Sequence, residues 1–263
     1  MPVEREIALV TGASSGIGAT YARKLAARGY DLILVARRGD RLDALSAELS
    51  ALHDTKVTKV VADLSTNAGV TAIEAVLADT TGVTMLVNNA GTAGLGTTDA
   101  LPAADIANML DLNITALTRL SRAAVVAFKA RNKGTIVNLA SAVSVAAMPV
   151  TSVYSGTKAY VLLFSLGLQQ ELQGTAVTVQ VVLPAAVATE IYDGSIMPLE
   201  QIPTAIVMTP DDMVEAALSG LVTGETVTWP SVPDLALWDQ YQSAAAALFN
   251  ATQSGRPADR YSV

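Results

Sequence analysis

Short, continuously apolar segments alternate with longer segments of helical periodicity along most of this chain. Continuous apolar runs are typical of parallel strands that are covered on both faces. The alternation therefore predicts an α/β fold, with a doubly wound sheet of about seven parallel strands, right-handed crossovers and helices on both faces. The predicted strands are Ile7–Val10, Asp31–Ala36, Val57–Ala62, Met85–Asn88, Thr135–Leu139, Thr178–Leu183 and, more weakly, Thr226–Trp229.

The segments between the strands carry the apolar stripes of amphipathic helices. After the second strand, Asp40 is expected to cap a helix. No linker, low-complexity tract or internal repeat interrupts the pattern, so we expect a single domain over residues 1–263. The stripe of the first helix comprises Ile17, Tyr21 and Leu25, and that of the second comprises Leu42, Leu45, Leu49 and Leu52.

Composition excludes several kinds of site. The chain has no cysteine, which rules out disulfides, thiolate catalysis and cysteine-ligated metals. Its one histidine, His53, lies in a polar stretch and is expected in a solvated loop, so we expect no metal. A net charge of −7 argues against nucleic acid as a partner. Neither a membrane span nor a signal peptide is evident, which predicts a soluble, cytoplasmic protein.

A glycine-rich segment, Thr11–Gly18 (TGASSGIG), follows the first predicted strand and opens a helix. Its GxxxGxG spacing differs from the GxGxxG dinucleotide fingerprint, but the physical logic is the same. Glycine lets the backbone approach a pyrophosphate, and the N-terminus of the helix supplies oriented N–H groups. This strand–turn–helix context predicts a dinucleotide site in a Rossmann fold, and an ordinary Gly/Ser turn is the alternative.

Two arginines, Arg37 and Arg38, follow the second predicted strand. An NAD-binding chain places an acid there for the ribose 2′-hydroxyl, whereas this chain has Ala36. Guanidinium groups are natural partners for a 2′-phosphate. Cations at a helix start also oppose the helix dipole, which argues against two merely solvated arginines. We therefore expect NADP(H), bound mainly by Arg37 with Ser14 and Arg38 assisting.

Tyr154 and Lys158 lie four residues apart and so share one face of a predicted helix, Ser152–Gln173. Tyrosine is a poor acid near neutral pH, since its reference pKa is about 10. A nearby ammonium group favours the phenolate and is expected to lower the pKa of Tyr154. Tyr154 could then act as a general acid toward a carbonyl, or as a general base toward an alcohol.

Together, these motifs resemble the short-chain dehydrogenase/reductase family from about Ile7 to Thr189. All of them occur in the family's order, each at the carboxyl end of a predicted strand or on the helix that follows. The further matching residues are Asp63-Leu64 after the third strand, Asn88-Asn89-Ala90-Gly91 after the fourth, Asn113, and Ser141 after the fifth.

The resemblance implies four catalytic residues. Tyr154 resembles the family's acid/base, and Ser141 resembles the hydroxyl that holds the substrate oxygen. Lys158 resembles the lysine that binds the nicotinamide ribose and lowers the pKa of the tyrosine. Asn113 resembles the residue that completes a proton relay through water.

The resemblance also implies a cofactor site, in which Asp63 and Leu64 lie by the adenine and Asn88 only supports its strand. The expected cofactor contacts are Gly12, Ser14, Ser15, Gly16, Ile17, Gly18, Arg37, Arg38, Asp63, Leu64, Asn89, Ala90, Gly91, Tyr154, Lys158, Pro184, Ala185, Val187 and Thr189. The implied division is a cofactor half over about 1–135 and a catalytic half over about 136–263, with a variable lid over about 188–210.

One segment departs from the family, which usually has Pro-Gly after the sixth strand. Here Pro184 is followed by Ala185. Val187 and Thr189 still match the positions that hold the nicotinamide carboxamide. Ala185 puts in doubt any backbone conformation that requires a positive φ, and it places a methyl group near the nicotinamide.

The substrate pocket is expected to be apolar. Around Ser141 it would include Val143 and Met148, and no lysine or arginine of the lid is evidently aimed at a carboxylate or phosphate. A small ketone, aldehyde or secondary alcohol is therefore favoured over a CoA-bound or carrier-bound acid. An NADPH-dependent carbonyl reductase is the main hypothesis. The alternatives are an alcohol dehydrogenase working oxidatively and a non-catalytic NADP-binding sensor, the latter disfavoured by the intact Ser141, Tyr154 and Lys158.

The sequence also predicts self-association. The segments Asp105–Lys129 and Ser152–Gln173 are apolar around most of their circumference, and exposed patches of that size usually mark interfaces. We expect them to pair about a two-fold axis as a four-helix bundle. The resemblance adds a second contact through Thr226–Trp229, so a homotetramer is favoured over a dimer. Light scattering coupled to size exclusion would measure the mass, and a fully active monomer at micromolar concentration would contradict the prediction.

Overall fold

The computed structural model describes residues 5–193 and 196–261, and the chain divides into two compact units, Met1–Pro230 and Ser231–Val263. The first unit holds the sheet and all the predicted site residues. The second contains α8 (Ala236–Ala251), in which Trp238 stacks on Tyr241 with ring centroids 5.3 Å apart. Residues Gly194 and Ser195 of the predicted lid lie outside the described residues. Among the described residues, no helix is both long and apolar enough to cross a membrane.

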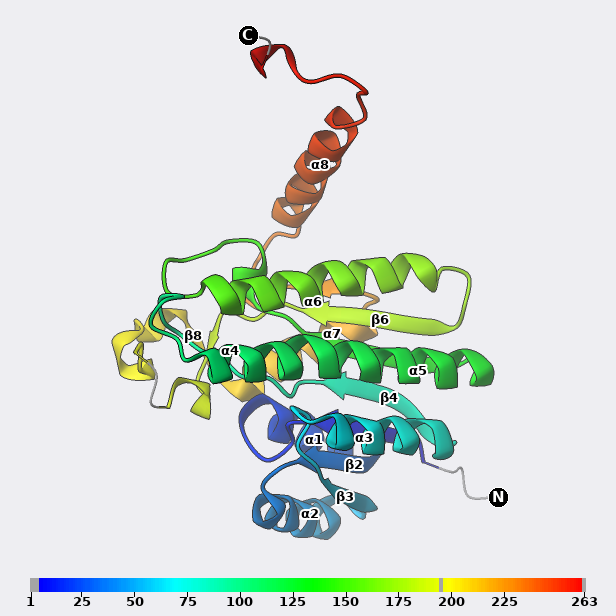
Figure 1. The fold of residues 1–263 in the computed structure, drawn as a ribbon. Helices are drawn as coiled ribbons and strands as arrows, with labels where there is room; N and C mark the ends of the chain where they lie inside the picture. Colours follow the sequence, from blue (N-terminus) through cyan, green and yellow to red (C-terminus); the bar gives the residue numbers. More distant parts are fainter. Residues whose placement is uncertain (1–4, 194–195, 262–263) are drawn as a thin grey trace. The chain divides into compact units, whose positions relative to one another are not determined.

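The described part of the first unit forms a sheet of seven parallel strands in the order β3-β2-β1-β4-β5-β6-β9 (Figure 1). The predicted fold class is therefore confirmed. After β3 the chain crosses back to add β4 beside β1, and a crevice forms at such a switch point. The strands are β1 (Ile7–Thr11), β2 (Asp31–Ala36), β3 (Val57–Val61), β4 (Val83–Asn88), β5 (Gly134–Leu139), β6 (Val177–Val182) and β9 (Val227–Thr228).

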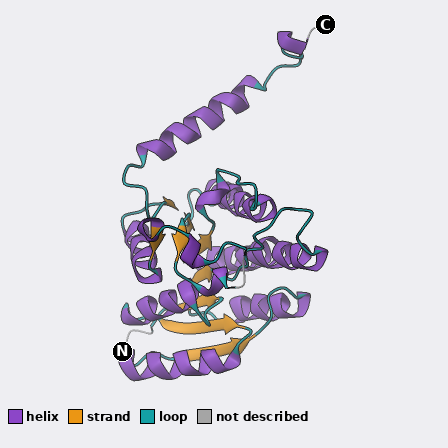
Figure 2. Cartoon of the chain, turned by 90° about the vertical axis from the view of Figure 1, so that its left-hand side faces the viewer, coloured by secondary structure: helices purple, strands orange, loops and turns teal. Residues whose placement is uncertain are grey.

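Helices cover both faces of the sheet, as Figure 2 shows. Successive strand residues point to opposite faces, so Ala8 and Val10 join one core while Leu9 joins the other. This is why the strand sequences are continuously apolar. The first core packs against α1 (Gly16–Ala27), α2 (Gly39–His53) and α7 (Pro210–Val222), and the second against α3 (Asn67–Asp79), α5 (Leu117–Arg131) and α6 (Ser152–Glu171).

A short second sheet, which the sequence did not predict, pairs β7 (Ala186–Val187) with β8 (Val207–Met208) in parallel. Each strand has only two residues, too few to produce a periodic signal. The pairing brings the two ends of the predicted lid together. The 3₁₀ turn Glu190–Tyr192 therefore starts three residues after the end of β7, whose backbone is held by its pairing with β8.

Helix α2 corrects three predictions. It begins at Gly39 with Arg38 as its N-cap, so Asp40 lies in the first turn and caps nothing. Leu52 is 67% exposed, since the stripe rotates away from the sheet near the end of the helix. His53 is the last residue of this helix and is partly buried, not part of a loop.

The predicted helix Asp105–Lys129 is divided in the structure. It consists of α4 (Ala103–Leu110), a π-helical turn (Asp111–Ala116) and α5. Periodicity does not reveal one π turn, because it adds only a single residue to the spacing. Val126 on α5 and Leu163 on α6 are 60% and 69% exposed in the single chain. These helices are therefore not covered on all sides by the chain itself.

Candidate active site

The glycine-rich loop packs so closely that no side chain fits at Gly12 or Gly18. Gly12 and Gly16 have positive φ values of 66° and 51°. A Cβ atom on Gly12 would lie 2.7 Å from Nδ2 of Asn89, and one on Gly18 would lie 2.3 Å from the carbonyl oxygen of Gly12. The N-cap of α1, Ser15, makes no side-chain capping bond. The amides of the first turn are thus left for another acceptor.

Hydrogen bonds tie this loop to the end of β4. Thr11 Oγ1 donates to Val87 O (3.1 Å) and accepts from the backbone amides of Asn89 and Ala90 (both 3.0 Å). Nδ2 of Asn89 donates to the carbonyl oxygens of Thr11 (2.9 Å) and Gly12 (3.3 Å). Asn89 therefore fixes the loop as well as lining the groove.

Asn88 has the supporting role expected for it. It is buried in the core, and its Nδ2 donates to Ser121 Oγ and to Asn138 Oδ1, both at 3.0 Å. Asn138 in turn donates to Ser165 Oγ (2.9 Å). This polar ladder connects β4 and β5 to α5 and α6.

A cavity of about 460 Å³ lies at the switch point between β1 and β4. The sequence did not single out Glu190, Ile191 and Asp193 from the lid, which also line it. The predicted residues that line it are Gly12, Ser14, Ser15, Gly16, Ile17, Arg37, Arg38, Asp63, Leu64, Asn89, Ala90, Gly91 and Thr189. The predicted contacts that do not line it are Gly18, Tyr154, Lys158, Pro184, Ala185 and Val187.

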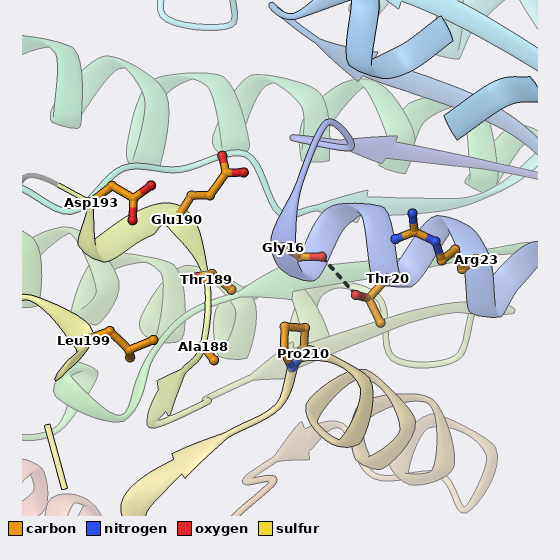
Figure 3. A pocket seen from close by; sticks show the side chains of 9 residues that line it. All are labelled: Gly16, Thr20, Arg23, Ala188, Thr189, Glu190, Asp193, Leu199 and Pro210. Atoms are coloured by element: carbon orange, nitrogen blue, oxygen red, sulfur yellow. Dashed lines mark hydrogen bonds between the residues drawn. The ribbon is translucent and has the colours of Figure 1, made fainter. Parts of the chain in front are cut away.

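A second hollow, of about 480 Å³, shares Gly16, Thr189, Glu190 and Asp193 with the first (Figure 3). It is open to solvent, and Thr20 Oγ1 donates to the Gly16 carbonyl at its edge (3.0 Å). Ser141, Tyr154 and Lys158 do not line it. The segment Thr189–Asp193 is therefore a wall between the two hollows.

Ala185 does not need the conformational freedom of glycine. Among the described residues other than glycine, only Asp54 and Asn132 have positive φ. Ala185 is exposed and follows buried Pro184. The doubt raised by the missing glycine therefore does not apply to this backbone.

The three predicted catalytic side chains Ser141, Tyr154 and Lys158 meet beside the cavity. Ser141 follows β5, and its hydroxyl forms a hydrogen bond with Tyr154. Lys158 Nζ lies 5.8 Å from the centroid of the Tyr154 ring and donates to Leu139 O (2.8 Å). A Cβ on Gly91 would be 3.7 Å from Nζ of Lys158, so the lysine reaches the wall of the cavity. This arrangement can hold and protonate an oxygen beside a bound dinucleotide.

Comparison with known proteins decides the family. The model of the short chain dehydrogenase family matches residues 6–196. A short-chain dehydrogenase from Sphingobium yanoikuyae, solved in complex with NADPH, is 42% identical with a TM-score of 0.93, covering 97% of this chain and 100% of that one. The chain belongs to the short chain dehydrogenase family. The resemblance inferred from the sequence is confirmed, and so is the class of reaction, oxidoreduction.

Two further relatives bear on the substrate. The bulky-bulky ketone specific alcohol dehydrogenase from Comamonas testosteroni is 36% identical, with a TM-score of 0.90 over 98% of this chain and 99% of that one. The very-long-chain 3-oxoacyl-CoA reductase-A of Danio rerio is 34% identical, over 81% of this chain and 66% of that protein. The chain thus spans about two thirds of the length of the curated relatives it matches.

Burial shapes the acid–base properties of this short-chain dehydrogenase. It raises the pKa of Tyr154 to about 12, although the hydrogen bond with Ser141 acts in the opposite direction. It lowers the pKa of Lys158 to about 8. The expected lowering of the Tyr154 pKa by Lys158 is therefore wrong for the protein alone, because burial of the phenol is the largest effect on its pKa and raises it.

Asn113 lies in the π-helical turn, and both the oxygen and the nitrogen of its side-chain amide are hydrogen-bonded to neighbouring residues. Its Oδ1 accepts from the amide of Thr92 (2.9 Å), and its Nδ2 donates to Thr92 O (2.9 Å) and Thr157 Oγ1 (3.1 Å). The side chain thus joins the loop after β4 to the helix that carries Tyr154 and Lys158. A proton relay through Asn113 stays a prediction.

At the end of the cavity after β2, Arg38 is hydrogen-bonded to its neighbours and Arg37 is exposed. Arg38 donates to Ser14 Oγ (3.0 Å), Ser15 Oγ (2.7 Å) and Glu190 Oε2 (2.8 Å). Hydrogen bonds from Ser65 lower the pKa of Asp63, with a smaller contribution from the charge of Arg37.

The lowered pKa of Lys158 predicts a specific dependence of stability on pH. The unfolded chain holds this proton up to about its ordinary pKa of 10.5, whereas the folded chain releases it near 8. The unfolded state then binds more protons between these values, so stability should rise with pH there. Relative to Lys158→Met, the cofactor-free wild type should gain about 2–3 kcal/mol between pH 7 and 10.

Urea unfolding of both proteins across this range measures the difference. Tyr154 is present in both proteins, so the effect of its raised pKa, which grows as the pH approaches 10, is common to the two curves. A stability difference that stays constant with pH would contradict the prediction.

Proposed function

We propose that this dehydrogenase is an NADPH-dependent carbonyl reductase acting on small apolar ketones or aldehydes. The observation that carries the proposal is the meeting of Ser141, Tyr154 and Lys158 beside the cavity that the glycine loop and Arg37 line. The NADPH complex of the Sphingobium relative supports the cofactor, and the name of the Comamonas relative, bulky-bulky ketone specific, supports a ketone as the substrate without setting its size.

The cavity fits a dinucleotide with a 2′-phosphate. The glycine loop leaves its helix amides uncapped and has no room for side chains at Gly12 or Gly18, so a pyrophosphate could approach the backbone. Arg37 and Arg38 line the end where an NAD enzyme would present an acid. When bound, the nicotinamide would supply the hydride donor or acceptor.

The chain's own residues handle the proton. In the reductive direction, Ser141 holds the carbonyl oxygen, and Tyr154 donates its phenolic proton to that oxygen as the alcohol forms. Because burial raises the pKa of Tyr154 to about 12, the phenol keeps its proton at neutral pH, as reduction requires. Lys158, held by Leu139 O, lies against the ring and would face the ribose.

Two other activities are candidates for the same site. In the reverse reaction these residues would oxidise a secondary alcohol, with Tyr154 as the base. The 3-oxoacyl-CoA reductases among the relatives make a 3-oxoacyl thioester a second substrate candidate. A non-catalytic NADP sensor is disfavoured by the intact Ser141, Tyr154 and Lys158. We further propose that the protein is cytoplasmic and forms a homo-oligomer, with a tetramer favoured over a dimer; the exposed apolar residues of α5 and α6 support self-association through these helices.

A substrate screen tests the proposed function. Purified enzyme would be incubated with NADPH or NADH and small ketones, bulky ketones, aldehydes or a 3-oxoacyl thioester, and separately with NADP+ or NAD+ and secondary alcohols, and nicotinamide absorbance would be followed. Faster oxidation of NADPH than of NADH, with ketones or aldehydes as substrates, supports the proposal. Turnover of the thioester alone, or of none of these compounds, would contradict it.

Tyr154→Phe should lower kcat by about 10²- to 10⁴-fold, the range for a positioned acid/base, and leave NADPH affinity unchanged. The substitution removes only the hydroxyl. Tyr160→Phe is the matched control, because Tyr160 lies on the same helix but is exposed and pairs with Thr118 (2.9 Å). Steady-state kinetics checks both variants, and near-normal turnover by Tyr154→Phe would exclude the mechanism.

Arg37→Ala should weaken NADPH binding by about 1.5–3 kcal/mol, the range for a hydrogen bond to a charged group, and leave NADH binding nearly unchanged. Fluorescence titration with each cofactor measures the two affinities. Arg122→Ala, an exposed arginine of α5 that does not line the cavity, serves as the control. Comparable losses with both cofactors would contradict the assignment.

A further inference from the structure

A carboxylate from the lid is paired with two arginines: Arg38, which lines the cavity, and Arg41, which lies beside it on the Glu190 carboxylate. Oε2 of Glu190 accepts from Arg38 Nη1 (2.8 Å), and its Oε1 accepts from Nη1 of Arg41 (2.5 Å). Glu190 is the first residue of the 3₁₀ turn that follows Thr189, and Arg41 lies in the first turn of α2. The ion pairs therefore connect two segments about 150 residues apart in sequence.

These contacts use the nitrogens of Arg38 that an incoming anion would need. Its Nε and Nη2 donate to the hydroxyls of Ser14 and Ser15, and Nη1 donates to Glu190. Ser14, Ser15, Arg38 and Glu190 all line the same cavity. The two arginines lower the pKa of Glu190 to about 2, so this carboxylate stays charged at any physiological pH.

We propose that Glu190 is an internal anion that competes with the cofactor's 2′-phosphate for Arg38 and Arg41, and thereby sets the affinity for NADPH relative to NADH. This inference rests on the proposed use of NADPH. A phosphate monoester carries a charge of about −1.5 to −2 at pH 7 and accepts strong hydrogen bonds from arginine. To form these hydrogen bonds, the 2′-phosphate must either displace the Glu190 carboxylate or share the arginines with it. NADH has no such group, so Glu190 hinders its binding far less.

The chain offers a matched control in Glu215. Its carboxylate also bridges two cations, Lys24 (3.0 Å) and Arg28 (2.6 Å). The Glu215 side chain is 47% exposed, close to the 43% of Glu190. Glu215 does not line either hollow described above. Glu215→Gln therefore makes the same change in net charge without touching the cavity.

The experiment compares wild type, Glu190→Gln and Glu215→Gln in calorimetric titrations with NADPH, NADH and adenosine 2′,5′-bisphosphate. We expect Glu190→Gln to tighten binding of NADPH and of the bisphosphate by about 5- to 30-fold, the factor that corresponds to about 1–2 kcal/mol. NADH should change by less than about twofold, and Glu215→Gln should bind all three like the wild type. Thermal melts would verify that both variants stay folded.

Two results would overturn the inference: unchanged or weaker NADPH binding by Glu190→Gln, or equal tightening for NADPH and NADH. The bisphosphate lacks nicotinamide, so its titration reports on the phosphate end alone. If Glu190→Gln tightens it while no carbonyl compound is reduced, the inference stands and the proposed function fails. If ketones are reduced with NADPH but Glu190→Gln tightens nothing, the function stands and the inference fails.

Discussion

The packing of Asn89 against the glycine loop is the contact on which the rest of the site depends. Nδ2 of Asn89 bonds the carbonyls of Thr11 and Gly12, and the same atom would collide with a Cβ at Gly12 or Gly18. The end of β4 and the turn after β1 are thereby held at one distance. That distance sets the width of the cavity and the direction of the α1 amides.

Tyr154 and Lys158, two of the proposed catalytic residues, illustrate how burial and position act together. Lys158 is buried with one hydrogen bond, to Leu139 O, and Tyr154 is partly buried beside it. Each environment disfavours the charged form, which raises the pKa of the phenol and lowers that of the ammonium. Both groups are therefore sensitive to any charge placed in the cavity. The protonation of Tyr154 would accordingly respond to a charged group placed beside it.

Much of the fold followed from the sequence, because the central strands are buried on both faces and a continuous apolar run records that directly. Motifs at strand ends were also accessible, since parallel strands bring their carboxyl ends to one edge. Long-range pairs left no such record. Glu190 meets Arg38 across 152 positions, and neither spacing nor composition indicates that contact. The cap of α2 and the π turn at Asn113 were missed because a shift of one residue is invisible to periodicity.

The Asn88–Asn138 ladder has a consequence for how the chain finds its native state. The two residues are direct partners in the pairing of β4 with β5, and both are buried. A slip of one strand by one position would turn its asparagine to the opposite face of the sheet, away from the other asparagine and from the serine that it contacts. Stranding amides in an apolar layer costs far more than the exchange of one aliphatic contact for another. The ladder thus favours the native register of β4 and β5. The valines and leucines around it could pack in a shifted register at little cost, whereas the buried asparagines could not.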